Sequence, residues 1–465
     1  MTNHIAIPEP EVVQRFDRPG PRYTSYPTAV EFHDGVGASV YREHLAKANR
    51  EHAGEPLSLY VHIPFCAKHC SYCGCHVIST PKREVAAQYL DYLGRELELV
   101  AGLLPERRRL IQMHWGGGTP TYLEPAQLEQ LFGLVARHFE LLPDSERAIE
   151  VDPRVTTTAH LEALAGLGFN RLSFGVQDFT PEVQEAIGRG QTFEQTKTLM
   201  ESARRVGFAD GINLDLVYGL PLQTEATFRD SLDRVTELRP DRLAIYSFAF
   251  VPWIRPNQKK IDQAALPARE AKMALYFAAL EKLLDAGYEP IGMDHFALPG
   301  DELARAARAG RLDRNFMGYT VKPSNAMIAF GVSGIGEVEG GFFANEKKLS
   351  RYYEALDAGE LPVERGYRLD ADDRIRQFVI RQLMCNFRVD KAAVAKRFGI
   401  DFDAYFAESL ATLDEVEAEG FVVVDAAAVT VQPSGRLFVR NVCMAFVRYL
   451  AAKREANRPV FSRTV

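Results

Sequence analysis

Residues 57–75 of the chain are LSLYVHIPFCAKHCSYCGC, an apolar run followed at once by four of the chain's six cysteines. The run Leu57–Ile63 has the length and composition of a buried strand. The loop after it holds Cys66, Cys70, Cys73 and Cys75. In parallel α/β folds, functional residues lie at the carboxyl ends of the strands. This stretch therefore predicts an α/β fold with its site at that edge.

Short apolar segments and amphipathic segments alternate from this strand onward. Strands are expected at 57–63, 110–115, 148–152, 170–176, 212–219, 242–248 and 288–293, and helices at 85–104, 125–139, 160–168, 192–206, 227–238 and 268–286. Such alternation indicates βαβ units around a parallel sheet. At least six strands in this rhythm predict a complete or partial (β/α) barrel.

The domain organisation follows from where this rhythm begins and stops. Residues 1–55 are interrupted by Pro and Gly, and we expect them to form an arm that packs on the catalytic domain. The barrel domain is predicted at 56–365. Residues 366–465 are predicted to form a smaller, mainly helical domain of winged-helix type, with a hairpin within 421–435 and a final helix at 436–455.

The composition is that of an ordinary globular protein, with 46% hydrophobic and 25% charged residues among 465. A net charge of −7 argues against nucleic-acid or membrane-surface binding, because polyanion binding needs a basic surface. No apolar stretch approaches the ~18 residues of a membrane span. We therefore expect a cytoplasmic location, where clustered thiols indicate metal or redox chemistry.

The cysteine spacing C-x3-C-x2-C favours an iron–sulfur cluster. Structural zinc sites use four ligands in two pairs, whereas three close thiolates leave one iron of a cluster without a protein ligand. A zinc site completed by Cys75, and thiols that are close by chance, remain the alternatives. Cys385 and Cys443 lie in apolar helical patterns, so we expect them in the core.

The same cysteine spacing resembles the signature of the radical S-adenosylmethionine (SAM) enzymes. The segments RYTSYPTA, YVHIPFC, the CGC ending, HWGGGTPTYL, EVDPR, SFGVQDF, NLDLVYGLP, GMDHFA, RNFMGYT and RLFVRNVCMAF narrow the resemblance to the oxygen-independent coproporphyrinogen III oxidases. It extends over nearly the whole chain, to the ending FSRTV. It implies a barrel of the radical SAM type, a 4Fe–4S cluster on Cys66, Cys70 and Cys73, and two molecules of S-adenosyl-L-methionine.

This resemblance also implies the reaction and its partners. Two propionate side chains of coproporphyrinogen III would be oxidatively decarboxylated to vinyl groups, giving protoporphyrinogen IX in anaerobic heme biosynthesis. A low-potential electron donor such as flavodoxin or ferredoxin, and a final electron acceptor, would be needed. A related heme-handling radical SAM protein, either a heme chaperone or a heme-modifying or heme-degrading enzyme, is the alternative, although such relatives generally lack RYTSYPT and the CGC ending. A zinc-stabilised regulatory module is the third interpretation of the sequence.

The cofactor contacts are implied residue by residue. The first SAM molecule would contact Tyr60, Gly117, Glu150 and Ile335; the second would contact Tyr72, Gly118, Thr119, Gln177, Arg189, Asp215 and Ala249. Gly117 would let the backbone approach the cofactor, and Asp215 is a carboxylate in an apolar strand, where a ribose or a neighbouring Arg would compensate its charge. Glu150 and Cys75 are the catalytic candidates. Cys75 could transfer a proton or hydrogen, or simply pack.

A substrate with four propionates requires local cations. The candidate substrate residues are Arg22, Arg154, Asp294, His295, Arg314, Phe316, Met317 and Lys322, with an ordinary surface charge as the alternative for each cation and a core position as the alternative for His295. Met317 departs from the family, which usually has Gln at this position. A thioether cannot replace the hydrogen bonds of an amide, so this departure bears on the substrate rather than on the cluster.

Overall fold

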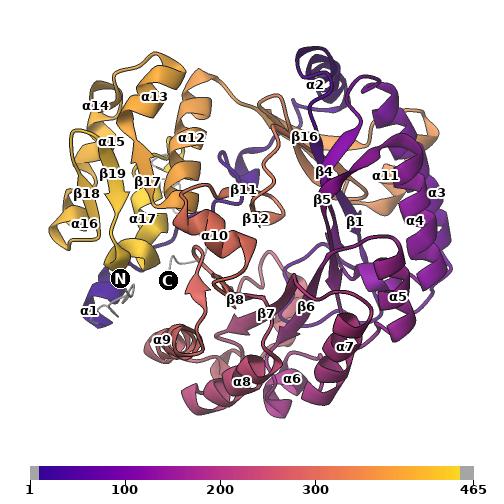
Figure 1. The fold of residues 1–465 in the computed structure, drawn as a ribbon, viewed down its shortest axis with the longest axis horizontal. Coiled ribbons are helices and arrows are strands. Elements are labelled where there is room, and N and C mark those ends of the chain that lie inside the picture. Colours follow the sequence, from indigo (N-terminus) through magenta and orange to yellow (C-terminus); the bar gives the residue numbers. More distant parts are fainter. Residues whose placement is uncertain (1–9, 451–465) are drawn as a thin grey trace.

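The computed structural model describes residues 10–450, and a twelve-stranded sheet forms its centre (Figure 1). The strand order is β16-β15-β14-β13-β1-β4-β5-β6-β7-β8-β10-β9. Six strands pair side by side in parallel: β1 (Leu57–Ile63), β4 (Arg109–Gly117), β5 (Glu140–Val151), β6 (Arg171–Gln177), β7 (Ile212–Tyr218) and β8 (Arg242–Ser247). The predicted parallel α/β sheet is confirmed.

The two ends of the sheet consist mainly of antiparallel strands. After β13 (Ala326–Phe330), which is parallel to β1, come β14 (Ile335–Val338), β15 (Gly341–Asn345) and β16 (Val363–Arg368). At the other end lie β10 (His295–Ala297) and β9 (Glu289–Pro290). Within residues 10–450, β9 and β16 do not pair with each other, so the barrel is partial.

Helices cover the outer face of this curved sheet (Figure 1). They are α3 (Val85–Gly102), α4 (Pro125–His138), α5 (Thr158–Gly166), α6 (Pro181–Ala186), α7 (Phe193–Arg205), α8 (Glu225–Leu238) and α9 (Arg269–Asp285). Six of the seven residues of β1 are buried, as expected for a strand covered on both faces. The apolar sides of the strands and helices form one continuous core.

Smaller elements connect and flank the sheet. They are α1 (Pro10–Phe16), α2 (Ala38–Glu51), β2 (Phe65–Cys66), β3 (Ile78–Ser79), α10 (Glu302–Arg308), β11 (Asp313–Asn315), β12 (Gly318–Thr320) and α11 (Leu349–Asp357), with 3₁₀ turns at Ala29–Glu31, Pro120–Tyr122, Pro256–Lys260, Gln263–Ala265 and Pro433–Phe438. None of the helices in residues 10–450 combines the length and the apolar character that a membrane crossing needs.

The C-terminal part is a separate layer of helices around a small sheet (Figure 1). It contains α12 (Ala371–Asn386), β17 (Arg388–Asp390), α13 (Lys391–Phe398), α14 (Phe402–Tyr405), α15 (Ala407–Ala411), α16 (Asp414–Ala418), β18 (Val422–Val424), β19 (Ala428–Val431) and α17 (Val439–Met444). The antiparallel order β17-β19-β18 includes the predicted hairpin.

The predicted final helix at 436–455 is wrong in extent. A 3₁₀ turn ends at Phe438, and α17 then ends at Met444. Val439, Val442 and Phe446 all lie in the same core, so their spacing in the sequence is that of one helix. The chain nevertheless leaves the helix and turns between Val442 and Phe446. Residues 451–455 of this prediction lie outside the described part of the chain.

The N-terminal arm divides its contacts between the two parts of the molecule. Val13, Phe16, Tyr23 and Tyr26 belong to the C-terminal core, whereas α2 contacts β14, β15 and β16 of the large sheet. In Figure 1, α1 lies beside the C-terminal elements. The prediction that the arm packs on the barrel therefore holds only for the later half of the arm. The domain limits near 55 and 365 stay predictions.

Removing the Phe16 ring tests this docking of the arm. Phe16 is 1% exposed, and its ring centroid lies 5.6 Å from that of Phe421 and 5.4 Å from that of Phe438. We expect Phe16→Ala to lower the free energy of unfolding of the C-terminal part by about 3–5 kcal/mol, measured by urea denaturation. Val30→Ala, at a half-exposed site of the same arm, should change it by no more than about 0.5 kcal/mol. Equal transition midpoints for the two variants would contradict this placement.

Candidate active site

A cavity of about 480 Å³ lies at the carboxyl ends of the parallel strands. Its walls come from the cysteine loop after β1, the glycine turn after β4, the ends of β5, β6 and β7, and the segment that begins with β8. The carboxyl ends of parallel strands meet at one edge of a sheet, so residues far apart in the sequence converge there. The cavity therefore lies at the edge that the position of the cysteines predicts.

All four clustered cysteines line this cavity. The thiol of Cys66 is 3.1 Å from Thr119 Oγ1, the Cys75 N–H donates to Cys73 Sγ at 3.4 Å, and Arg189 Nη1 donates to Cys70 Sγ at 3.9 Å. Cys66 and Cys70 are buried, Cys73 is half-buried and Cys75 is exposed. N–H donors beside Cys70 and Cys73, and a hydroxyl beside Cys66, give all three thiols polar partners, unlike packed apolar thiols.

Two residues of the loop after β8 hold the backbone of the cysteine loop. Asn257 Nδ2 donates to the carbonyl oxygens of Cys70, Ser71 and Cys73, at 3.2, 3.1 and 2.9 Å. Gln258 Nε2 donates to the Tyr72 carbonyl at 3.1 Å. The spacing of the thiols is thus maintained by a second segment of the cavity wall.

The protonation tendencies of these thiols differ. Burial, partly offset by the hydrogen bond with Thr119, raises the pKa of Cys66 to about 12. The hydrogen bond between Cys75 and Cys73 lowers the pKa of Cys73 well below its usual value and raises that of Cys75. A thiolate at Cys66 therefore needs a bound metal, which deprotonates a thiol ligand outright. Cys75 is the partner that retains its proton.

The thiol spacing suits a multi-iron cluster better than a single ion. Two thiolates on one tetrahedral zinc lie about 3.8 Å apart, given Zn–S bonds of ~2.3 Å. Among the described residues, two groups of possible ligands have their atoms within 4.8 Å of one another, and neither contains a cysteine. The zinc alternative is therefore disfavoured, and three thiols in one loop beside an open cavity fit a 4Fe–4S cluster with one free iron.

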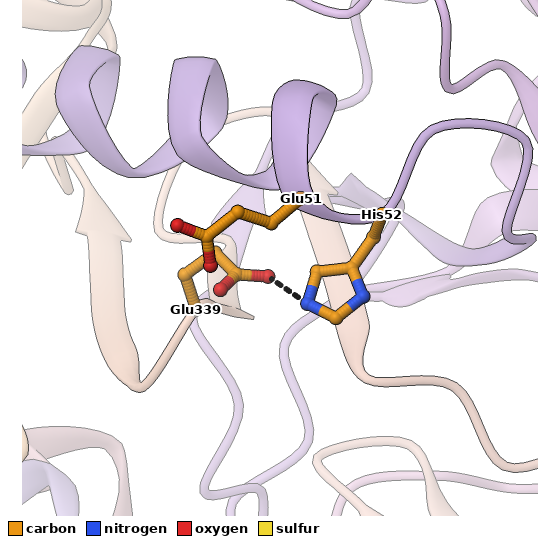
Figure 2. A group of neighbouring side chains, drawn as sticks. All are labelled: Glu51, His52 and Glu339. Atoms are coloured by element: carbon orange, nitrogen blue, oxygen red, sulfur yellow. Dashed lines mark ion pairs between the residues drawn. The ribbon is translucent and has the colours of Figure 1, made fainter.

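One of those two groups, shown in Figure 2, consists of Glu51, His52 and Glu339 at the end of α2. His52 Nε2 lies 3.2 Å from Glu339 Oε1, and Lys47 Nζ lies 3.7 Å from Glu339 Oε2. Arg107 Nη1 is 3.9 Å from the same carboxylate. The protein's own cations neutralise Glu339, so this group is explained as an ion-pair network far from the thiols.

The glycine turn after β4 brings Glu150 to the cavity. The Gly117 N–H donates to Glu150 Oε2 at 3.1 Å, and the Gly118 N–H donates to Ile63 O at 2.8 Å. Gly117 has φ +122°, a backbone conformation that residues with a side chain rarely adopt, and a Cβ added to Gly118 would lie 2.6 Å from Pro64 O. Both positions therefore require glycine, and the Glu150 side chain remains 42% exposed in the cavity wall.

Asp215 of β7 is a buried carboxylate with neutral partners. Ser173 Oγ donates to Asp215 Oδ2 and Asn213 Nδ2 donates to Oδ1, both at 2.8 Å. Burial raises the pKa of Asp215 to about 6. Asp215 lines the cavity, and the predicted alternative of an Arg partner is absent from its hydrogen bonds in the described part of the chain. The carboxylate therefore retains acceptor capacity toward a ligand.

Arg154 and Arg189 share one carboxylate at the cavity wall. Arg154 Nη2 lies 2.6 Å from Asp152 Oδ2, and Arg189 Nη2 lies 3.4 Å from Asp152 Oδ1. The guanidinium groups hold the pKa of Asp152 below its usual value in spite of its burial. Arg154 lines the cavity, as predicted, but its charge is already paired.

The predicted cofactor residues are largely brought together. Those that line the cavity are Tyr72, Gly117, Gly118, Thr119, Glu150, Gln177, Arg189, Asp215 and Ala249. Gln177 has φ +74°, a strained conformation that functional sites often contain. Tyr60 and Ile335 do not line it: the Tyr60 hydroxyl is 3.1 Å from His62 Nδ1, and Ile335 packs beside Phe316 and Phe342.

Comparisons with known proteins agree with this geometry. The radical SAM superfamily model matches residues 60–235, and the HemN C-terminal domain model matches residues 369–438. Oxygen-independent coproporphyrinogen III oxidases from Pseudomonas aeruginosa and Escherichia coli are each 44% identical to this chain, over 98% of both chains. A solved structure of coproporphyrinogen III oxidase from Escherichia coli, described as a radical SAM enzyme, matches with a TM-score of 0.91 and 42% identity, over 96% of this chain and 100% of that chain.

The chain belongs to the oxygen-independent coproporphyrinogen III oxidase family. The predicted radical SAM barrel is confirmed by the solved oxidase structure. The cofactors of this oxidase are a 4Fe–4S cluster and S-adenosylmethionine. The heme-handling alternative is not favoured, because the match to oxidases extends over 98% of both chains.

The predicted substrate residues of this oxidase fall into separate places. Arg22 and Arg154 line the cavity. Asp294 lies behind it, 3.5 Å from Arg22. Burial lowers the pKa of His295 to about 4, and its ring lies edge-on to Tyr246, which places it in the second layer of the wall.

The remaining four candidates lie outside the cavity lining. Arg314 is placed over the Tyr319 ring at 4.8 Å, beside a smaller cavity between the arm and α12. Phe316 packs edge-on against Phe342, and the Met317 N–H donates to Asn315 Oδ1 at 2.9 Å. Lys322 is at the opposite end of the barrel, where it pairs with Asp144 at 2.9 Å. The structure thus separates Lys322 from the thiol cavity of this oxidase.

Several site residues were not found from the sequence. Asn257 and Gln258, which hold the cysteine loop, belong to the segment PNQKK, which matches no motif. Ser173 and Asn213 contribute to the site by donating hydrogen bonds to Asp215. The alternation of β6 and β7 places Ser173 and Asp215 on adjacent strands, which pair at Gly175 and Asp215. That register comes from the structure, so the sequence held no signal for the Ser173 contact.

Four single Cys→Ala variants of this oxidase test the ligand assignment. We expect Cys66→Ala, Cys70→Ala and Cys73→Ala to lose the cluster, because a missing thiolate exposes a second iron. Cys75→Ala should retain it, since Cys75 serves as a hydrogen-bond partner of Cys73. Iron content and visible absorption of anaerobically purified protein measure the outcome. Retention in Cys66→Ala together with loss in Cys75→Ala would reverse the assignment.

Proposed function

We propose that this protein oxidatively decarboxylates two propionate side chains of coproporphyrinogen III to vinyl groups, giving protoporphyrinogen IX without oxygen. One observation carries the proposal. Three thiols and two carboxylates, Glu150 and Asp215, converge on one cavity in a chain that is 44% identical to named oxidases over 98% of its length. When bound, the cluster and S-adenosylmethionine supply the radical chemistry that abstracts a hydrogen atom.

The chain's own residues hold and orient the reactants. Cys66, Cys70 and Cys73 would hold three irons of the cluster. Glu150, which accepts a hydrogen bond from the Gly117 N–H and is 42% exposed, would accept a further hydrogen bond from a cationic amino group. Asp215 would accept hydroxyl hydrogen bonds with the lone pairs that Ser173 and Asn213 leave free.

The reaction balance sets what else is needed. Each propionate gives up one hydrogen atom, one CO₂ and one electron as its vinyl group forms. Two propionates fit two molecules of S-adenosylmethionine, a low-potential donor such as flavodoxin or ferredoxin, and a final electron acceptor. Cys75 lines the cavity with an exposed thiol that retains its proton, and so remains our candidate for proton or hydrogen transfer.

An anaerobic assay tests the function directly. Reconstituted protein, coproporphyrinogen III, S-adenosylmethionine, a chemical reductant and an electron acceptor should yield the mono-vinyl intermediate and then protoporphyrinogen IX, followed by mass spectrometry. Met317→Gln should change the rate by no more than about tenfold, because one hydrogen bond contributes ~0.5–1.5 kcal/mol. Deoxyadenosine release with neither vinyl product would refute the substrate assignment and leave the radical chemistry standing.

The raised pKa of Asp215 gives a pH test of its proposed role. Because this pKa is about 6, the acceptor form is lost as the pH falls below that value. Affinity for S-adenosylmethionine, measured by calorimetry, should weaken from pH 7.5 to pH 5.5, whereas Asp215→Asn should bind less tightly with little change over this range. A wild-type affinity that does not vary with pH would contradict a role for the Asp215 carboxylate.

A further inference from the structure

Side chains of the C-terminal part donate hydrogen bonds to backbone carbonyl groups of the arm. Arg440 Nε and Nη2 donate to the carbonyl oxygens of Pro21 and Gly20, at 2.9 and 2.5 Å. Asn441 Nδ2 donates to Phe16 O at 2.7 Å. Arg440 is 5% exposed, so these hydrogen bonds form away from water. The arm is therefore held just before the residue that reaches the cavity.

That residue is Arg22. The side chain of the next residue, Tyr23, packs in the C-terminal core and not in the cavity. Tyr23 has φ +51°, an uncommon conformation for an aromatic residue, and its buried ring belongs to the C-terminal core. Arg22 instead lines the thiol cavity and keeps 36% of its side chain exposed. Local strain of this kind persists where surrounding contacts determine the backbone. Here those contacts direct Arg22 into the cavity.

Positive charge accumulates at this side of the cavity. Arg22, Lys272 and Arg440 lie near one another, with Asp294 and Asp17 as the neighbouring acids. Burial, with a contribution from Arg22 and Arg440, lowers the pKa of Lys272 to about 8, and burial with Arg22 lowers that of Arg440 to about 10. Asp17 is paired with Arg269 at 3.1 Å, which leaves Asp294 as the acid nearest to Arg22. A bound carboxylate would therefore meet Arg22 with a second cation, Lys272, close by.

We propose that Arg22 binds one carboxylate of the substrate and that Arg440 is the positioning residue that holds Arg22 in place through the Gly20 and Pro21 carbonyls. The proposal rests on the proposed function, because that substrate carries propionates. Asp294, whose Oδ2 lies 3.5 Å from Arg22 Nη2, holds the guanidinium until the substrate carboxylate replaces it. The arm, held by the C-terminal part, thereby completes a site whose other walls belong to the barrel.

A double-mutant cycle separates positioning from general stability. Binding of coproporphyrin III, the fluorescent oxidised macrocycle with the same four propionates, is measured on the full-length protein. We expect Arg22→Ala to raise its dissociation constant about 10- to 100-fold and Arg440→Gln to raise it about 3- to 10-fold. The double variant should bind no more weakly than Arg22→Ala, because Arg440 acts through Arg22. In turnover, Arg440→Gln should raise KM with little change in kcat.

Arg18→Gln is the matched control. Arg18 also joins the arm to the C-terminal part, pairing with Glu415 at 2.9 Å, but does not line the cavity. Its dissociation constant should stay within about twofold of the wild type. If Arg440→Gln does not fold, Arg440→Lys, which retains one donor group, should show the same KM effect at smaller size.

The outcomes are distinct. Single-variant effects that multiply in the double variant would overturn the positioning role of Arg440. Unchanged binding in Arg22→Ala would overturn the carboxylate contact. If the wild type converts coproporphyrinogen III in either case, the proposed function stands without this inference; a wild type that neither binds the porphyrin nor converts the porphyrinogen refutes both.

Discussion

The close approach of the Gly117–Gly118 backbone to the end of β1 is the constraint on which the positions of the Cys66 thiol and the Glu150 carboxylate depend. A side chain at Gly118 would meet the backbone of Pro64 and Phe65, and one at Gly117 would meet the His62 ring and Ile63 O. Backbone atoms cannot move aside as the end of a flexible side chain can, so the contact tolerates only glycine. This approach places Thr119 against the Cys66 thiol and the Gly117 N–H against Glu150. The thiols and the first carboxylate of the cavity are thus positioned by one backbone contact.

The parts of the fold that depend on local pattern could be predicted from the sequence. Strands β1 and β4–β8 have short apolar runs between amphipathic helices, and parallel strands necessarily bring their carboxyl ends to one edge. That logic brought Cys66 and Glu150 to a common cavity without any distance being known, whereas Asp215 was predicted there only from the family resemblance. The docking of the arm could not be predicted, because Phe16 packs on residues more than 400 positions away and nothing in its local sequence identifies them. The same holds for Asn257, whose contacts with the cysteine loop join two loops of different strands.

The substrate candidates show why residue type alone does not assign a role. Arg22 and Lys322 are both cations beside aromatic or polar segments, yet they lie at opposite ends of the barrel. Lys322 lines a cavity of about 510 Å³ at the amino ends of the strands, with Asp144, Glu146, Asp301 and Glu302. There Arg171 and Arg242 pair with the acids, which is the arrangement of a stabilising ion network. Only the topology of the arm, which crosses from the C-terminal part to the cavity, places Arg22 in the wall of the thiol cavity.

The arginines that line the cavity differ in how closely each is paired with a carboxylate of the protein. Arg154 contacts both oxygens of Asp152 at 2.6–3.2 Å, and Arg189 is buried against the same carboxylate, so both guanidinium groups are held in the wall, although one carboxylate offsets only one of their two charges. Arg22 Nη2 lies 3.5 Å from Asp294 Oδ2, a longer contact, and the Arg22 side chain remains about one-third exposed. A bidentate, buried pair loses more than it gains by releasing its carboxylate, whereas a single longer contact at the surface of a cavity exchanges partners readily. In a chain of net charge −7, the proposed substrate carboxylate would therefore meet a cation that the fold leaves incompletely paired, and the hydrogen bonds from Arg440 to the arm hold that cation in the wall of the thiol cavity.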